Sequence, residues 1–390
     1  MTQDDERIDE FAGRASTERR TIGNESIYFD DGQRNMLRAL RSSWAWRTEW
    51  PTWLLIGLIY SAWFGTALHA RRLGLPATVA LLSVISAWYL SLQHELIHGH
   101  PTRIAWVNGL LGFAPLAVWF PYETYRRSHL AHHAASELTD PKIDPETLFV
   151  TANDWQQADS VMRMMLVFRT TFVGHVLIGP AFGIVSSVRD SWRRISNGDF
   201  GEASIWIVHL LVLAKLVAWL KTACGIPALP FIGGVGYPAL CIASIRSFRE
   251  HRYHPDPACR TVINLAALPW RLLFLNNNFH AVHHHLPGVP WYGLRIVYLS
   301  WSDDYQRRNG GYVVYGYRQW LGQFALKRRS PLIHPSSRSE SAVAPLPRGK
   351  RLTAVERLPA QTTRQRAHRR SFDAGAGSHA SPSASALSSR

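Results

Sequence analysis

The chain has 390 residues and a formal net charge of +15, a length that suits one large domain or two smaller ones. Residues 327–390 carry a net +10 of that charge, so the basic balance belongs mostly to a tail and does not by itself indicate a nucleic-acid-binding protein. None of the three cysteines lies in a CxxC pair, which argues against an iron–sulfur cluster and a disulfide scaffold.

The N-terminal part of the chain is polar and leads into two apolar stretches. Residues 1–49 are charged throughout and lack the basic-then-apolar pattern of a cleaved signal peptide. Residues 51–70 and 77–93 are mainly apolar and approach or reach membrane-spanning length. The arginine-containing break between them predicts a helical hairpin. On this prediction residues 1–49 are a polar cytosolic segment, and His94 lies at the membrane surface on the same side.

Three more apolar segments follow in the second half of the chain. Residues 203–222 and 226–245 are candidate spans joined by a tight turn, whereas 164–188 is weaker because it contains an arginine, a histidine and a proline. The chain also carries three clusters of histidines, which are described below. If they share one site, an even number of membrane crossings must separate each cluster from the next. One of the three segments should therefore not cross, and we predict that it is 164–188. Four spans in two hairpins result.

The arginines agree in part with this topology. They gather before the first span, between the second and third, and after the fourth, on the side that the positive-inside rule assigns to the cytoplasm. Arg71, Arg72 and Lys221, in the predicted outer turns, are exceptions. We expect an integral, multi-pass protein of a bacterial inner membrane, with the histidine site and both termini in the cytoplasm.

The end of the chain changes composition. From residue 331 it is rich in serine, arginine, proline and alanine and contains few large apolar residues. Such a segment cannot bury enough surface to offset the entropy of ordering it. We therefore predict a membrane domain over residues 50–330 and a disordered basic tail over 331–390, with electrostatic contact to anionic lipid as its expected role.

Three histidine clusters and one isolated histidine lie among the apolar runs. Imidazole is the commonest metal ligand and suits iron as well as zinc. The spacings i, i+3 and i, i+4 place side chains on one face of a helix, so each cluster can aim several rings at one point. The candidate ligands are too many for one tetrahedral zinc ion and suggest two metals. They are His94, His98, His129, His132, His133, His251, His280, His283 and His284.

Two other interpretations of the histidines are weaker. The first cluster, His94-Glu95-Leu-Ile-His98, also matches HExxH, which in a metalloprotease helix supplies two zinc ligands and a general base. A membrane zinc metalloprotease would need a third ligand that the sequence does not indicate, and it would leave the other clusters unexplained. Ordinary surface histidines are the better interpretation for isolated ones such as His175 and His334, but not for three spaced clusters.

The order HxxxH, HxxHH, HxxHH, interleaved with apolar hairpins, resembles the membrane fatty acid desaturase superfamily. That superfamily also contains alkane hydroxylases, sterol-modifying oxidases, and carotenoid hydroxylases and ketolases. The resemblance covers about residues 50–300. Residues 94–103 (HELIHGHPTR), 247–252 (SFREHR) and 280–292 (HAVHHHLPGVPWY) are similar to a bacterial subgroup labelled fatty acid desaturase. The resemblance implies an all-α integral membrane fold of four transmembrane helices in two hairpins, with a cytosolic helical cap that holds a histidine-rich dimetal site.

The same resemblance implies the cofactor and its ligands. Two iron ions would be bound almost entirely by the nine histidines, with O2 as co-substrate. Carboxylates and amides near such a site orient the ligand rings. For that role we name Glu95, Asn277 and Glu250, and Asp140 and Asp144 are further candidates.

The implied reaction is O2-dependent desaturation of a fatty acyl chain, carried as an acyl lipid or an acyl thioester. The alternative on the same scaffold is a hydroxylase or other oxygenase acting on another lipid, a carotenoid or a small substrate. The sequence contains neither the His-Pro-Gly-Gly motif of a fused cytochrome b5 nor a flavin or nicotinamide fingerprint. Electrons are thus expected from a separate ferredoxin, or from a cytochrome b5-like protein with its reductase. The candidate docking arginines are Arg126, Arg127, Arg249, Arg252 and Arg260.

Overall fold

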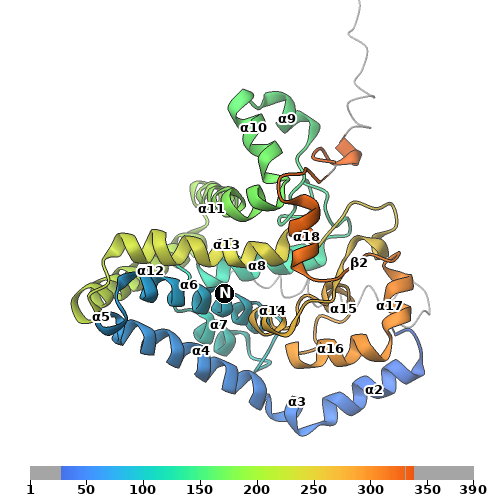
Figure 1. Ribbon diagram of the computed structural model, residues 1–390, viewed down its shortest axis with the longest axis horizontal. Coiled ribbons are helices and arrows are strands. Elements are labelled where there is room, and N and C mark those ends of the chain that lie inside the picture. The colour runs from blue at the N-terminus through green and yellow to red at the C-terminus, as the bar shows by residue number, and fades with distance from the viewer. Residues whose placement is uncertain (1–27, 330, 338–390) are drawn as a thin grey trace, which may run out of the picture. The chain divides into compact units, whose positions relative to one another are not determined.

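The computed structural model describes residues 28–329 and 331–337, and these residues are mainly helical (Figure 1). Two short strands, β1 (Ile263–Asn264) and β2 (Val313–Val314), pair in parallel and form the one sheet among the described residues. The mainly helical fold predicted from the sequence is therefore confirmed. The predicted N-terminal segment up to residue 27 and the predicted tail from residue 338 lie outside the described residues.

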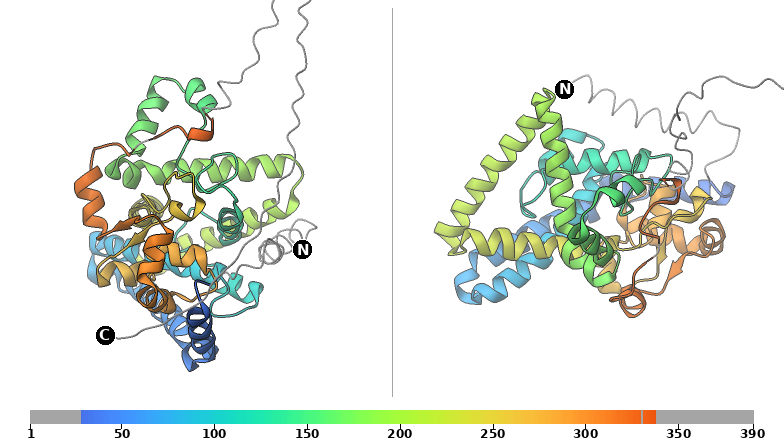
Figure 2. Two further views of the ribbon diagram at one scale, coloured as in Figure 1. Left: turned by 90° about the vertical axis from the view of Figure 1, so that its right-hand side faces the viewer. Right: turned by 90° about the horizontal axis from the view of Figure 1, so that it is seen from above.

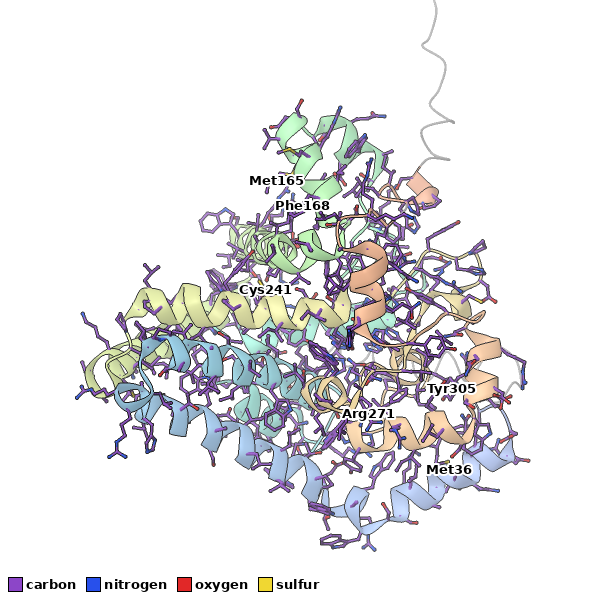
Figure 3. The ribbon with its side chains drawn as sticks, in the orientation of Figure 1. Met36, Met165, Phe168, Cys241, Arg271 and Tyr305 are labelled. Carbon is purple, nitrogen blue, oxygen red and sulfur yellow. The ribbon has the colours of Figure 1, made fainter. Side chains whose placement is uncertain are left out.

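The first helices pack against the C-terminal part of the fold. Helix α2 (Asp31–Ser42) begins at Asp30, whose carboxylate accepts the amide of Gln33. Helix α3 (Trp44–Thr48) follows directly. The Gln33 side chain donates to the hydroxyl of Tyr305 on α17 (Ser302–Arg308), a residue labelled in Figure 3. The end of the predicted polar segment is thus folded onto the residues that follow the third histidine cluster.

Helices α4 (Trp50–Leu68) and α6 (Leu75–Ile97) lie side by side and are joined by α5 (Ala70–Leu73) (Figure 1). A proline in the first turn of each long helix suits this position, because the amide that proline lacks would have no helical partner there. Trp63 of α4 is fully buried, and its Nε1 donates to Ser86 Oγ of α6 at 3.1 Å. This contact fixes the two apolar helices against each other.

The next elements carry the chain to the second histidine cluster and beyond it. The carbonyl of Gly112, at the end of α7, accepts bonds from Tyr89 and Gln93 of α6, which satisfies a group that the helix end leaves unpaired. The bounds are α7 (Ala105–Gly112), α8 (Tyr122–Ala134), α9 (Ala152–Gln157), α10 (Ser160–Arg169), α11 (Phe172–Ser196) and α12 (Phe200–Trp219).

Within the part of the chain that the structure describes, four helices are long and apolar enough to cross a membrane: α4, α6, α11 and the combined helix Phe200–Cys224, which extends α12 through the π-helical η1 (Leu220–Cys224). Three of them overlap predicted spans. The fourth, α11, covers most of the segment that we predicted not to cross. The predicted span 226–245 is instead formed by π-helical η2 (Pro230–Gly236) and α13 (Tyr237–Ser247), where prolines and glycines interrupt regular α-helix.

The ends of α11 both lie near the histidine-bearing elements. At its start, His175 Nε2 is 3.1 Å from Ser247 Oγ at the end of α13. At its other end, Arg194 pairs with Asp199 and Glu202, and Glu202 pairs with Arg127 of α8. Seen from above, α11, α12 and α13 form the three sides of a triangle (Figure 2, right). Length alone therefore does not decide whether α11 crosses a membrane.

Helix α12 runs from one end of the helical bundle to the other, and the η2–α13 segment runs back. The end of η1 lies beside α5, where a Cβ on Gly225 would come within 3.3 Å of the Arg71 side chain. The returning segment packs along α6, and Ser83 Oγ donates to the Gly234 carbonyl at 3.1 Å. This segment ends at Ser247, four residues before His251.

The C-terminal elements fold over the histidine-bearing ends of α6, α8 and α13. Their bounds are η3 (Pro257–Arg260), α14 (Leu268–Leu273), α15 (His280–His285), α16 (Trp291–Ser300), α17 and α18 (Tyr317–Phe324). Residues 331–337, which we assigned to the tail, also contact this part: Ile333 bridges to Val150, and His334 is buried.

Candidate metal centre

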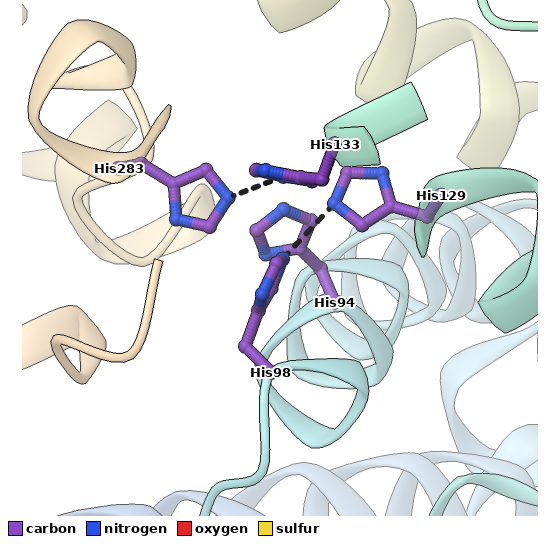
Figure 4. Close-up of side chains that lie close together, drawn as sticks. All are labelled: His94, His98, His129, His133 and His283. Atoms are coloured by element: carbon purple, nitrogen blue, oxygen red, sulfur yellow. Dashed lines mark hydrogen bonds between the residues drawn. The ribbon is translucent and has the colours of Figure 1, made fainter. Parts of the chain in front are cut away.

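The nine histidines predicted as ligands lie in two adjacent groups. Within each group, one ring nitrogen per residue lies within 4.8 Å of the others. We call the first the α6 group, drawn in Figure 4: His94, His98, His129, His133 and His283. We call the second the α15 group: His132, His251, His280 and His284.

The HxxHH pattern supplies both groups from one helix. On α8, His129 and His133 are four residues apart and face the α6 group, while His132 between them faces the α15 group. The arrangement on α15 is reversed, because His280 and His284 face the α15 group and His283 faces the α6 group. Each HxxHH helix therefore lies between the two groups.

The distances between ring nitrogens match those of ligands that share one ion. A metal–nitrogen bond of about 2.1 Å puts two ligands at right angles about 3.0 Å apart. In the α6 group, the Nε2 atoms of His98 and His129 are 3.0 Å apart, and those of His133 and His283 are 3.1 Å apart (Figure 4). The α15 group has the same spacing, with distances of 3.1 to 3.2 Å among the Nε2 atoms of His132, His251, His280 and His284.

The outer ring nitrogens indicate which atoms face the centre of each group. His132 Nδ1 is 2.7 Å from Asp144, and His280 Nδ1 is 3.0 Å from Asn277 Oδ1. Each contact needs a proton on Nδ1, which in a neutral ring leaves a lone pair on Nε2. The Nε2 atoms of His132 and His280 each lie 3.1 Å from His251 Nε2. The lone pairs on these nitrogens would repel one another unless a cation lay between them. The donor set therefore fits a metal ion.

Burial keeps most of these rings neutral. It lowers the pKa of His133, His283 and His284 well below the ordinary value, and the neighbouring histidines add to the effect. His132 differs: burial would lower its pKa, but the hydrogen bond to Asp144 and the nearby carboxylates raise it overall. Neutral imidazole is the form that binds a metal.

The three residues that we predicted to orient the ligand rings have different environments. Asn277 lies between the two groups, with Oδ1 3.0 Å from His280 Nδ1 and Nδ2 3.2 Å from His94 Nε2. Glu250 lies 3.6 Å from His280 Nδ1 and pairs with Arg246 at 2.6 Å. Glu95 accepts the amide of Trp291, and its carboxylate is 4.0 Å from His94 Nδ1. Glu95 is thus held by the backbone and does not face the centre of a group.

The contacts of Glu146 were not predicted. Its carboxylate lies 3.3 Å from His129 Nδ1, and it follows Asp144 in a loop that folds back over α8. The signal in the sequence is the acidic stretch Asp-Pro-Lys-Ile-Asp-Pro-Glu directly after the second histidine cluster. Within the described residues neither histidine group contains a carboxylate. Asp144 and Glu146 instead place negative charge next to the groups, by contacting the outer nitrogens of ligand rings.

Two adjoining cavities open beside the histidines. The larger, about 320 Å³, lies between α11, α13 and the loop 139–149, and reaches His132, His251 and His280. The smaller, about 150 Å³, lies between α6, α8 and α13, and reaches His94. Both are bordered by Phe120, Leu240, Ala243 and Arg246. A third, more polar depression of about 420 Å³ reaches His133 and His284 and is lined by residues of η3 and α17.

The arginines proposed for donor docking are mostly engaged within the protein. Arg127 pairs with Glu202, and Arg260 is 4% exposed and pairs with Glu137. Arg252 donates to the carbonyls of Cys259 and Asn309. The expected basic surface is therefore largely neutralised by intramolecular contacts.

A family model described as fatty acid desaturase matches residues 70–316, which is more than half of the chain and contains all nine histidines. The chain belongs to the fatty acid desaturase family. It is also similar to a fatty acid desaturase of Bacillus subtilis (strain 168), with 23% identity over 243 residues, or 56% of this chain and 66% of that protein. The match spans just under two thirds of the relative. The resemblance to the desaturase superfamily is confirmed, and four apolar helices fit an integral membrane protein.

Proposed function

We propose that this protein is a membrane oxidoreductase that removes two hydrogens from a fatty acyl chain, with O2 as co-substrate. The observation that supports this reaction best is the pair of all-histidine groups beside an internal cavity, in a member of the fatty acid desaturase family. Two separate groups favour two metal ions, and iron is favoured over zinc because the five nitrogen donors of the α6 group exceed the four that tetrahedral zinc takes. When bound, the irons would supply the oxidising power toward an unactivated C–H bond.

The protein residues would position the ions, orient the rings and exclude water. His94, His98, His129, His133 and His283 would hold one ion, and His132, His251, His280 and His284 the other. Asp144, Glu146 and Asn277 would keep the rings oriented, the first two by holding a proton at Nδ1. The apolar walls formed by Phe120, Leu240 and Pro180 would align the chain and keep water away.

The electron balance requires a partner. Desaturation supplies two electrons, and reduction of O2 to water takes four, so two must come from an external donor such as a ferredoxin or a cytochrome b5-like protein. The polar depression that reaches His133 and His284 is the candidate approach, because it reaches two histidines of the groups that the larger cavity does not reach. The arginine patch is a weaker candidate, since its residues are paired.

For the membrane we propose four spans in two hairpins: α4 with α6, and α12 with the η2–α13 segment. Helix α11 would lie along the cytoplasmic surface, because its start contacts Ser247, four residues before His251, and Arg194 near its end pairs with Glu202, which pairs in turn with Arg127 of α8. Its C-terminal turns also contain arginines and an aspartate that a span would expose to lipid. The histidine groups and the C-terminal helices would then form a cytosolic cap.

The metalloprotease interpretation loses support at Glu95. A general base must reach the metal-bound water, and this carboxylate instead accepts the Trp291 amide. A hydroxylase would use the same site, and only the product distinguishes it from a desaturase.

The test is a mass-spectrometric lipid profile of the native host. A strain lacking the gene is compared with strains restored by the wild type or by His283→Ala, with His69→Ala as control because His69 is exposed and lies in neither group. We expect an acyl species two hydrogens lighter than its precursor, restored by the wild type and the control only. Loss of a hydroxylated metabolite instead would favour the oxygenase. Unchanged metabolites, with zinc in the purified protein, would contradict both.

A further inference from the structure

Two arginines lie at or next to the larger cavity. Arg329 lines this cavity, and its backbone amide donates to the carbonyl of Thr170, the residue after Arg169. Arg169 donates to the carbonyl of Leu148, which also lines the cavity, at 3.1 Å. The two side chains come from α10 and from the segment after α18, elements far apart in the sequence.

Neither guanidinium has a carboxylate partner. Within the described residues no Asp or Glu oxygen lies within 4.0 Å of Arg169 or Arg329. Arg329 donates from Nη1 to the Phe248 carbonyl at 3.3 Å, but its buried Nε has no partner. Aromatic rings cover both groups, with Phe182 4.7 Å from Arg169 and Phe149 5.3 Å from Arg329. Most of the hydrogen-bonding capacity of this pair is unused.

The positive charge is costly at this place. Burial lowers the pKa of Arg329 to about 9, with Arg169 as the next contributor, and burial lowers the pKa of Arg169 to about 10. A buried guanidinium without a counterion loses its hydration and gains little in return. The three carboxylates that border the same cavity are engaged elsewhere: Asp144 with His132, Glu146 with His129 and Glu250 with Arg246. The pair therefore lacks a negative charge that a ligand could supply.

A third polar group at the same cavity is also unsatisfied. His175 is buried and lines the cavity, its Nε2 contacts Ser247, and its Nδ1 has no partner. The wall of the cavity also includes Leu240, Pro180 and Gly183, which carry no polar side chain. A ligand with a polar head and an apolar chain would match this distribution.

We propose that Arg169 and Arg329 bind an anionic head group of the substrate, a carboxylate or a phosphate, while its apolar chain extends along the cavity toward the α15 group. This inference rests on the proposed function, in that the same cavity is the substrate site. Guanidinium groups suit this role because they donate two parallel bonds to carboxylate or phosphate oxygens.

The test is equilibrium binding to the iron-loaded protein in detergent. Three probes with the same chain are compared: palmitate, hexadecyl phosphate and the neutral methyl palmitate. We expect the wild type to bind at least one anion about tenfold or more tightly than the methyl ester, as charge-assisted bonds require. R329Q and R169Q should lose that preference. R163Q is the matched control, because Arg163 also donates to backbone carbonyls and stacks on Trp155, but away from the cavity.

The outcomes are distinct. Preference for palmitate assigns the head group as a free carboxylate, and preference for hexadecyl phosphate assigns it as a phospholipid head. Equal wild-type binding of all three probes, or an unchanged preference in R329Q and R169Q, overturns the proposal. If R329Q does not fold, Arg329→Lys replaces it, because lysine keeps the charge but not the two parallel donors. We expect this variant to retain the preference for the anion at reduced strength. An undiminished preference would mean that the Arg329 guanidinium does not bind the head group. Iron content and the lipid profile are separate measurements, so failure of the proposed reaction would leave the binding result intact.

Discussion

At the scale of single residues, the two metal groups depend on partners that hold the outer nitrogens of the rings. Asp144 is buried and receives the Nδ1 proton of His132 at 2.7 Å, while its second oxygen accepts the Thr139 amide. Its carboxylate therefore fixes both the tautomer and the direction of a ring in the α15 group. Loss of such a partner in a metalloprotein typically lowers metal affinity or activity by roughly 10- to 100-fold.

Asp144→Asn should therefore lower iron affinity about 10- to 100-fold, because the amide can present N–H to Nδ1 and favour the wrong tautomer. Titration of the purified apoprotein with ferrous iron measures the effect. Asp140→Asn is the matched control, since Asp140 lies in the same loop but contacts Ser336 and the Lys142 amide. Equal iron affinity in the two variants would mean that Asp144 does not orient His132 for metal binding.

At the scale of elements, the membrane topology depends on α11. It has the length and apolar composition of a span, yet its start contacts Ser247, close to His251, and its end is linked through Glu202 to Arg127 of α8. Helix α12 differs, because it begins beside α8 and its extension ends beside α5. Two helices of similar length are thus distinguished by the contacts at their ends.

We expect a cysteine at position 197, in the turn after α11, to be cytoplasmic, and one at position 72, in α5, to face the opposite side. Asn197 and Arg72 are both exposed, so each is a suitable site. In a cysteine-free background, a membrane-impermeant maleimide should label Arg72→Cys in intact spheroplasts and Asn197→Cys only after permeabilisation. Labelling of both in intact cells would mean that α11 crosses.

At the scale of the whole molecule, the site is confined to one part of the chain. All nine histidines lie between residues 94 and 284, and the residues that border the larger cavity end at Arg329. Residues 327–390 carry a net +10 of the formal charge. Most of the net charge and the histidine groups therefore belong to different parts of the sequence.

Removal of residues 344–390 should leave about two irons per chain and unchanged turnover, because every ligand and cavity residue found among the described residues is kept. Binding to anionic vesicles should weaken if the tail contacts lipid as its charge suggests. Iron analysis and vesicle flotation of the truncated protein measure the two effects. A fall in iron content would show that the tail supports the site.

The sequence by itself determined the nine histidines and the helical, apolar character of the chain. These features depend on local spacing and composition, since positions i, i+3 and i+4 share a helix face whatever the rest of the chain does. Asn277 and Glu250 were also named from the sequence, because they lie close to His280 and His251 in the chain, and their side chains lie 3.0 Å and 3.6 Å from His280 Nδ1.

Only the tertiary structure decided how the histidines divide into two groups, since each HxxHH helix lies between them. It also placed Glu146 at His129, turned Glu95 toward the Trp291 amide, and left Arg169 and Arg329 without a carboxylate. Such pairings join residues 17 to 196 positions apart, and they depend on which helix ends meet. Local spacing determines which side chains share a face, whereas packing determines what that face contacts.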